Sequence, residues 1–206
     1  MWNIWKNKRR WIQAVCGGLA VCLLLSLGGF YGRCREVRDS VVRLHILANS
    51  DSREDQALKL RVRDAVVQAA AGWLDGAADA TEALEMARQQ LPRLEQVARQ
   101  TVTAAGYDYP VTAQLCEMYF TTRQYDTVTL PAGVYEAVRF TIGAGKGKNW
   151  WCVVFPPMCV GTATDPAALE DLLDPGQTDL VEGGQRYIVR FKLVEWLENL
   201  VRFFRR

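Results

Sequence analysis

Apolar and polar positions divide the chain into one long uncharged run and a series of shorter periodic segments. No charged residue occurs from Trp11 to Tyr31, a stretch of 21 positions. A helix needs about 20 mostly apolar residues to cross the hydrocarbon core of a bilayer. Four basic residues precede the run: Lys6, Lys8, Arg9 and Arg10. Because basic flanks stay on the cytoplasmic side, we predict a cytoplasmic segment (1–10), a transmembrane anchor or signal segment (11–31) and an exported remainder.

The sequence leaves open whether the apolar segment is cleaved. The run is long for a signal peptide, and no clear A-x-A site follows it. The alternative is cleavage of the segment beside the small residues around Ser26 and Gly28. We favour an uncleaved anchor, followed by a polar linker over residues 32–40 and an exported signalling domain over residues 41–206.

Residues 41–105 have the pattern of a strand followed by two helices. In the strand 41–47, Val42, Leu44 and Ile46 alternate with Arg43 and His45. Alternate strand residues face opposite sides, so we expect Arg43 and His45 to point away from the core.

The two helices carry apolar residues at helical spacing. A capping box, Ser52-x-x-Asp55, opens the first, and Asp75-Gly76 ends it. Its apolar stripe consists of Leu58, Val62, Ala65, Ala69 and Trp73. The second spans 81–105, with a kink or break expected at Pro92.

Residues 111–206 have mainly strand patterns. We predict strands at 111–120, 134–142, 150–155 and 186–192, a short helix opening at 164–166, and a final helix at 193–206. The order indicates an α+β fold: a mostly antiparallel sheet with helices packed on one face, preceded by one N-terminal transmembrane or signal helix. For the final helix, packing on the sheet is favoured over lying on a membrane surface.

Charge and residue content exclude several functions. Residues 33–206 contain 21 basic and 23 acidic side chains, which argues against nucleic-acid binding. A single histidine cannot supply a two-histidine metal site. The segment 143–149 (GAGKGKN) lacks the G-K-[ST] of a phosphate-binding loop and precedes a strand, so we expect a flexible hairpin loop. We predict no cofactor, no metal and no small-molecule substrate.

The six cysteines fall into two groups of three. Cys16 and Cys22 lie in the apolar segment, with Cys34 just after it. Cys116, Cys152 and Cys159 belong to the exported domain, where oxidation is possible. Cys152 and Cys159 flank a proline-containing segment that a short loop can close, so we predict a disulfide between them.

A candidate partner-binding surface combines the end of the first strand with the tryptophan pair. Neighbouring strand residues face opposite sides, so we expect one tryptophan in the core and one available as an aromatic anchor. The predicted surface comprises Arg43, His45, Asn49, Asp51, Trp150 and Trp151. Two alternatives remain open: an exported hydrolase using His45 with Asp51 or Asp55, and a cell-wall-binding module using exposed aromatic residues. We favour a role for the acids in capping the helix.

Three runs resemble the stage II sporulation protein R family. They are 43–52 (RLHILANSDS) with Asp55-Gln56 and 58–64 (LKLRVRD), then 143–159 (GAGKGKNWWCVVFPPMC), then 190–195 (RFKLVE). The similarity covers nearly all of residues 41–200, and the Asn-Trp-Trp-Cys segment is highly specific. Cys116 matches no motif of the family.

The resemblance implies a non-enzymatic function in endospore formation. Proteins of this family are made in the forespore and exported into the space between forespore and mother cell. There they trigger a membrane-embedded aspartic-type protease in the opposing membrane, which processes the precursor of an early mother-cell sigma factor. The resemblance supplies no catalytic residues.

Overall fold

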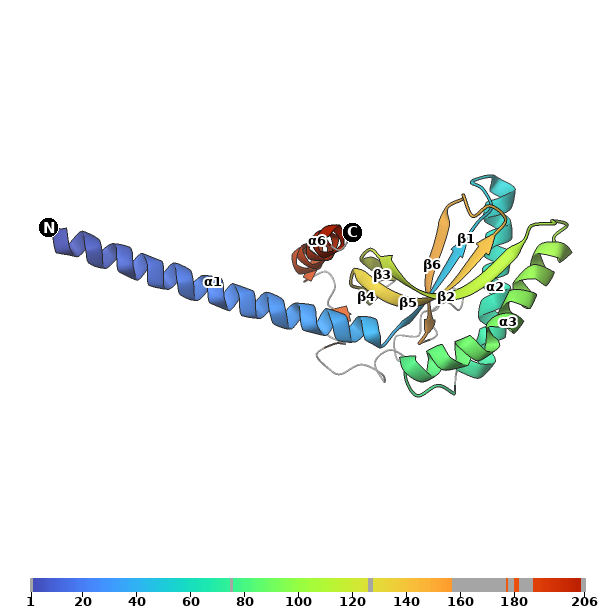
Figure 1. The fold of residues 1–206 in the computed structure, drawn as a ribbon, viewed down its shortest axis with the longest axis horizontal. Coiled ribbons are helices and arrows are strands. Elements are labelled where there is room, and N and C mark those ends of the chain that lie inside the picture. The colour runs from blue at the N-terminus through green and yellow to red at the C-terminus, as the bar shows by residue number, and fades with distance from the viewer. Residues whose placement is uncertain are drawn as a thin grey trace.

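The N-terminal helix α1 (Trp2–Asp39) projects as a long rod from the rest of the protein (Figure 1). This computed structural model describes residues 2–74, 76–125, 128–156, 177, 180–181 and 187–204. Within that part of the chain, the stretch of α1 from Arg10 to Asp39 alone is long and apolar enough to cross a membrane. The helix continues to Asp39, so most of the expected linker is helical.

A four-stranded sheet forms the centre of the domain. It contains β1 (Val42–Leu47), β2 (Val111–Phe120), β5 (Gly133–Ile142) and β6 (Asn149–Phe155) in the order β2-β5-β1-β6. β1 is parallel to β5 and antiparallel to β6, and β2 is antiparallel to β5. A separate pair joins β3 (Arg123–Tyr125) to β4 (Val128–Leu130). The predicted α+β class is confirmed.

Helices α2 (Arg53–Leu74) and α3 (Ala80–Ala104) cover one face of the sheet. Burial along α2 recurs every four residues from Leu58 through Val62, so that the stripe passes through Val66 and Ala70 rather than Ala65 and Ala69. In α3 the Asp79 side chain caps the first turn by accepting a hydrogen bond from the Glu82 amide at 2.8 Å. The helix continues through Pro92 without the expected break.

The opposite face of the sheet is also covered. Its apolar cluster joins the end of α1, the β3–β4 pair and the C-terminal helix α6 (Ile188–Phe204). Phe30 of α1 is fully buried, and its ring lies 5.4 Å from that of Phe191 in α6. The domain formed by the sheet and its covering helices is therefore built directly onto the end of α1.

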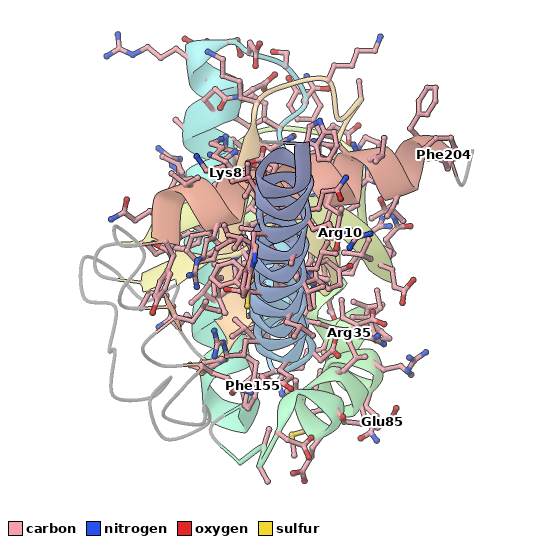
Figure 2. All side chains as sticks on the ribbon, turned by 90° about the vertical axis from the view of Figure 1, so that its left-hand side faces the viewer. Lys8, Arg10, Arg35, Glu85, Phe155 and Phe204 are labelled. Atoms are coloured by element: carbon pink, nitrogen blue, oxygen red, sulfur yellow. The ribbon has the colours of Figure 1, made fainter. Side chains whose placement is uncertain are left out.

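Helix α6 begins earlier than the sequence pattern predicted. Residues 188–192, expected to belong to a strand, are helical. The reason is visible in its buried positions, Phe191, Val194 and Glu198, which recur at steps of three and four. Viewed along α1, α6 runs across the domain (Figure 2). The predicted short helix at 164–166 lies outside the described residues.

The cysteines divide by bonding state as well as by position. Cys16, Cys22, Cys34 and Cys116 are free thiols. Cys152 is buried in β6 and disulfide-bonded. Cys159 lies outside the described residues, so the Cys152–Cys159 pairing remains a prediction.

Phe30→Ala is expected to destabilise the domain by about 3 kcal/mol. The substitution opens a cavity beside Phe191 and Tyr187, within the apolar cluster on the face of the sheet opposite α2 and α3. Leu24→Ala, on the exposed part of α1, is the matched control and should change stability by less than about 0.5 kcal/mol. The measurement is urea unfolding of the full chain in detergent. Equal stability of the two variants would show that α1 is not part of the domain core.

Non-reducing peptide mapping of the exported protein should recover one peptide pair joined through Cys152 and Cys159. Closing so short a loop contributes about 2–3 kcal/mol by the chain-entropy estimate. Recovery of a Cys152–Cys116 pair would contradict the prediction.

Candidate partner-binding surface

Strand β1 positions the first predicted site residues, but it buries two of them. Arg43 is 0% exposed and His45 is 3% exposed. The expectation that they face solvent is wrong, although the alternation behind it is right: both lie opposite Val42, Leu44 and Ile46. The face that carries Arg43 and His45 is covered by the end of α1, the β3–β4 pair and α6, and the residues around β1 do not reveal this.

Arg43 is held in a group of aromatic rings. Its guanidinium carbon lies 4.3 Å from the ring centroid of Phe120 and 5.1 Å from that of Tyr135. Its Nε donates a hydrogen bond to the Cys152 carbonyl at 3.0 Å, and Nη2 donates one to the Tyr125 hydroxyl. Burial lowers the pKa of Arg43, and the neighbouring tyrosines oppose this shift. Cation–π contacts and hydrogen bonds thus hold a buried cation that ties β1 to the β3–β4 pair.

His45 stacks on Trp151. The two ring centroids are 4.1 Å apart and the planes differ by 6°. The pKa of His45 is lowered to about 4, chiefly by burial; Asn149 opposes this shift, and the charge of Arg139 on β5 adds to it. Neither ring nitrogen meets a hydrogen-bond partner of good geometry among the described residues. At neutral pH His45 is therefore an uncharged stacking residue.

Asn49 and Asp51 anchor the loop that connects β5 to β6. Asn49 Oδ1 accepts from the Ala144 amide at 2.9 Å, and Asp51 Oδ1 accepts from the Lys148 amide at 2.6 Å. A Cβ at Gly147 would lie 2.1 Å from the Ser50 carbonyl oxygen, so only glycine allows this approach. The expected flexible hairpin is instead a fixed crossing loop, because β1 lies between β5 and β6 in the sheet.

Asp55 takes the capping role that the sequence favoured. Its carboxylate accepts hydrogen bonds from Asn49 Nδ2 at 2.9 Å and from Ser50 Oγ at 2.5 Å. Its amide donates to Ser52 Oγ at 3.1 Å. These bonds, that from Ser50 foremost, lower the pKa of Asp55. Asp55 opens α2 on one face of the sheet, whereas His45 belongs to the other face, so the structure does not assemble the predicted acid–base pair.

The two tryptophans are half-buried on opposite faces. Trp150 faces α2, where the guanidinium carbon of Arg63 lies 4.4 Å from its ring centroid. Trp151 contacts His45 and, edge to face at 4.8 Å, Phe120. The expected opposite faces are confirmed, but the expectation of one core tryptophan and one available as an aromatic anchor is wrong, because each indole is partly covered by a neighbouring side chain.

The accessible remainder of the predicted site lies at the end of the sheet where β1 finishes. We define the strand-end surface by its exposed residues: Asp51, Ala144, Lys146, Lys148 and Asn149. Two loops almost 100 residues apart in sequence, held together by the bonds above, form it. Such a preformed surface suits recognition of a macromolecule.

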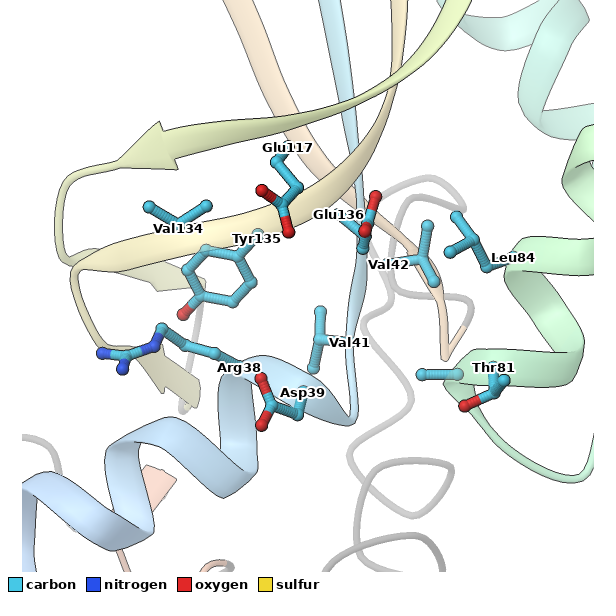
Figure 3. A pocket seen from close by; sticks show the side chains of 11 residues that line it. Arg38, Asp39, Val41, Val42, Thr81, Leu84, Glu117, Val134, Tyr135 and Glu136 are labelled. Carbon is cyan, nitrogen blue, oxygen red and sulfur yellow. The ribbon is translucent and has the colours of Figure 1, made fainter.

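A pocket lies at the other end of the sheet, between the end of α1, the start of α3, and β2 and β5 (Figure 3). Its lining includes Glu117 and Glu136, which face each other across the β2–β5 pair. No histidine or cysteine lines it, and the described residues contain no cluster of three metal-ligating side chains. Its side chains form neither a nucleophile–base pair nor a metal site.

Sequence reasoning missed the residues around Arg43 and His45, namely Phe120, Tyr125, Tyr135 and Arg139. They come from β2, β3 and β5, which long-range pairing and packing bring close to β1. Arg139, for example, is paired with His45 across the parallel β1–β5 junction. Only the aromatic content of residues 119–135 hinted at an apolar environment.

We expect the free energy of unfolding to fall between pH 6.5 and pH 4 through His45, the single histidine. The unfolded chain binds a proton near pH 6.5, and the folded chain binds one only near pH 4, so protonation favours unfolding between these values. The contribution is roughly 2 kcal/mol after allowance for solvent screening.

His45→Phe keeps a stacking ring without the titration and is the matched control. Its unfolding free energy, measured by urea titration at several pH values, should lack this part of the pH dependence. Parallel curves for the two proteins would contradict the assignment.

Comparisons with known proteins agree on one family. The family model described as Stage II sporulation protein R matches residues 38–165. Stage II sporulation protein R of Bacillus subtilis (strain 168) is 34% identical over 187 residues, which cover 80% of this chain and 83% of that protein. No solved structure matches. With a match over more than half of its length, and with the three specific runs in place, the chain belongs to the stage II sporulation protein R family.

Proposed function

We propose that this protein is an exported signal of endospore formation that activates a membrane-embedded aspartic-type protease. Activation leads to processing of the precursor of an early mother-cell sigma factor. Membership of a sporulation family supports the process. The mechanism rests on the resemblance and on the following features of the structure.

The proposed location is the space between forespore and mother cell, with α1 as an uncleaved anchor and the protease in the opposing membrane. The uncharged run behind a basic N-terminus supports export. The end of α1 supports anchoring, because Phe30, Cys34 and Val37 are fully buried in the domain core. An anchor joined rigidly to its domain presents that domain at a fixed height above the membrane.

One observation argues most strongly for a signal over a hydrolase. His45 stacks on Trp151 on one face of the sheet, while Asp51 and Asp55 are bonded into loops at its end. A general base must reach the proton that it abstracts and needs a partner to orient it. Trp150 and Trp151 give the cell-wall-binding alternative no support, because neither is a freely exposed platform.

We propose the strand-end surface as the face that contacts the protease. Asn49 contributes by holding the crossing loop, and Arg43 and His45 contribute by supporting β1 from beneath. Trp150 and Trp151 then flank the surface with partly accessible ring edges.

The test is co-expression of the full chain with the candidate protease and its precursor substrate in a host that lacks all three. Precursor cleavage should require every component, and it should stop when the catalytic aspartates of the protease are replaced. Cleavage without the protease would assign the hydrolysis to this chain and overturn the proposal.

Removal of residues 2–29 should leave a folded domain in the cytoplasm that does not support precursor processing. The cut lies before Phe30 because that side chain packs against Phe191. Fusion of an unrelated cleavable export signal to the truncated chain is the control and should restore part of the activity. A cytoplasmic form as active as the full chain would contradict the proposed topology.

Reversing both lysine charges of the strand-end surface, Lys146→Glu with Lys148→Glu, should reduce processing at least about tenfold, as expected for loss of interface contacts. Both side chains are exposed, so stability should change by less than about 0.5 kcal/mol. Arg88→Glu with Arg93→Glu, exposed on α3, reverses the same charge elsewhere and should leave processing intact. Equal activity of the two double variants would place the interface away from this surface.

A further inference from the structure

Helix α6 has two apolar faces. Its inner face is formed by the apolar residues Phe191 and Val194 and by Glu198, whose carboxylate is paired with Arg38; all three are buried in the protein. Successive residues of an α-helix are about 100° apart, so residues two positions later lie on roughly the opposite side. Those positions are also apolar, and they are exposed: Leu193, Trp196 and Leu200.

Further exposed apolar residues widen the outer face toward the C-terminus. Trp196 is 62% exposed, Phe203 74% and Phe204 77%. Four polar residues form a separate sector between the faces: Lys192, Glu195, Asn199 and Arg202. Arg190, near the start of the helix, lies outside this sector and contacts the rings of Phe30 and Tyr187. A helix with an exposed, aromatic-rich apolar face and a polar flank is typical of an interfacial membrane helix.

The place of α6 along α1 supports that interpretation. Tyr31 of α1 donates a hydrogen bond to Glu198 at 2.7 Å, and Arg38 forms an ion pair with the same carboxylate at 3.3 Å. The exposed apolar side chains of α1 end at Leu25. At about 1.5 Å per residue, Tyr31 is some 9 Å beyond Leu25 along the helix. An interfacial helix buries its apolar face about 5–10 Å into the boundary between headgroups and acyl chains. The contact between α6 and Tyr31 is therefore at the level along α1 where this boundary is expected.

The orientation of α6 agrees with this location. Where α1 lies lengthwise, α6 is seen nearly end-on (Figure 1). Where α1 is viewed along its axis, α6 runs across it, with Phe204 at the far end (Figure 2). If α1 crosses a bilayer, α6 therefore runs along the membrane plane.

The charge of this segment suits an anionic lipid surface. Residues 188–206 contain five basic side chains and two acidic ones. Of the acids, Glu198 is already paired with Arg38. Basic residues beside an apolar interfacial face add attraction to anionic headgroups.

From the two faces, the location and the orientation, we infer that the outer face of α6 lies in the interfacial layer of the bilayer that α1 crosses. The inference deepens the proposed function, since it relies on α1 as an anchor. Two contacts with one membrane, a spanning helix and a surface helix, then fix the tilt of the exported domain. The strand-end surface is held in a defined direction for the protease in the opposing membrane.

Site-specific fluorescence in the full chain, reconstituted into vesicles containing phosphatidylglycerol, tests the inference. Single cysteines replace Trp196 on the outer face, Asn199 in the polar sector, or Val21 on α1, and each carries a nitrobenzoxadiazole label. The cysteines that are free among the described residues, Cys16, Cys22, Cys34 and Cys116, are replaced by alanine, and this unlabelled background sets the baseline. Lipids with a doxyl group near the headgroup end of the acyl chain serve as quenchers.

We expect quenching at Trp196→Cys to be several-fold stronger than at Asn199→Cys, with a blue-shifted emission. Equal quenching at the two positions would overturn the inference. So would protection of position 196 that is lost on dilution of the protein in lipid, because the outer face would then bind a second copy of the chain. The Val21→Cys label lies near the middle of the apolar segment and is read separately, with lipids that carry the doxyl group near the end of the acyl chain. Weak quenching by these deep quenchers would contradict the proposed anchor, whereas the label at position 196 reports α6 itself.

Discussion

Strand β1 is hydrogen-bonded on both edges and buried on both faces, and most of the architecture follows from this constraint. All six of its residues are buried, including a cation and an imidazole. A polar group removed from water is costly unless it meets compensating contacts. Arg43 meets carbonyl, hydroxyl and aromatic partners, and His45 remains neutral against Trp151. The second face of the sheet must therefore be covered, and the end of α1, the β3–β4 pair and α6 provide the cover.

That cover connects the apolar segment of α1 to the rest of the protein. An exported domain on a flexible tether would sample many orientations. Here the helix that leaves the apolar segment continues into the core of the domain, and α6 packs across it. The residues that bury β1 are thus partly the same residues that hold the domain against its anchor. A signal directed at a protein in a nearby membrane gains from such restraint, because less orientational freedom is lost on binding.

The sequence predicted the features that depend on local physical chemistry. The uncharged run, the alternation in β1, the Ser52–Asp55 cap and the first half of the α2 stripe, Leu58 and Val62, all follow from residues close together in the chain. Strand order depends on long-range pairing, and there local reasoning failed. Because β5 and β6 lie on either side of β1, residues 143–149 cross the end of β1 and meet Asn49 and Asp51. The same pairing explains why Arg43 and His45 are buried, which alternation alone cannot reveal. Residues 188–192 show a third cause, since a short amphipathic segment has apolar positions compatible with either a strand or a helix.

The two runs that most resemble the family meet at this strand end, so the candidate site contains both supporting and accessible residues. Asn49, Asp55 and Gly147 hold the loops in place, and the side chains that remain exposed form the surface. The proposed non-catalytic function agrees with a domain whose histidine is neutral and whose described residues assemble no acid–base pair. The same division of the candidate site separates residues that act through the fold from residues available to a partner.

The measurement that tests this division most directly is precursor processing by the His45→Phe variant in the co-expressed system. Phenylalanine can stack on Trp151 but cannot transfer a proton. If His45 acts only through the fold, the variant should support processing at close to the wild-type rate at neutral pH. A variant that remains folded and exported but no longer supports cleavage would contradict this account and give the imidazole a chemical role.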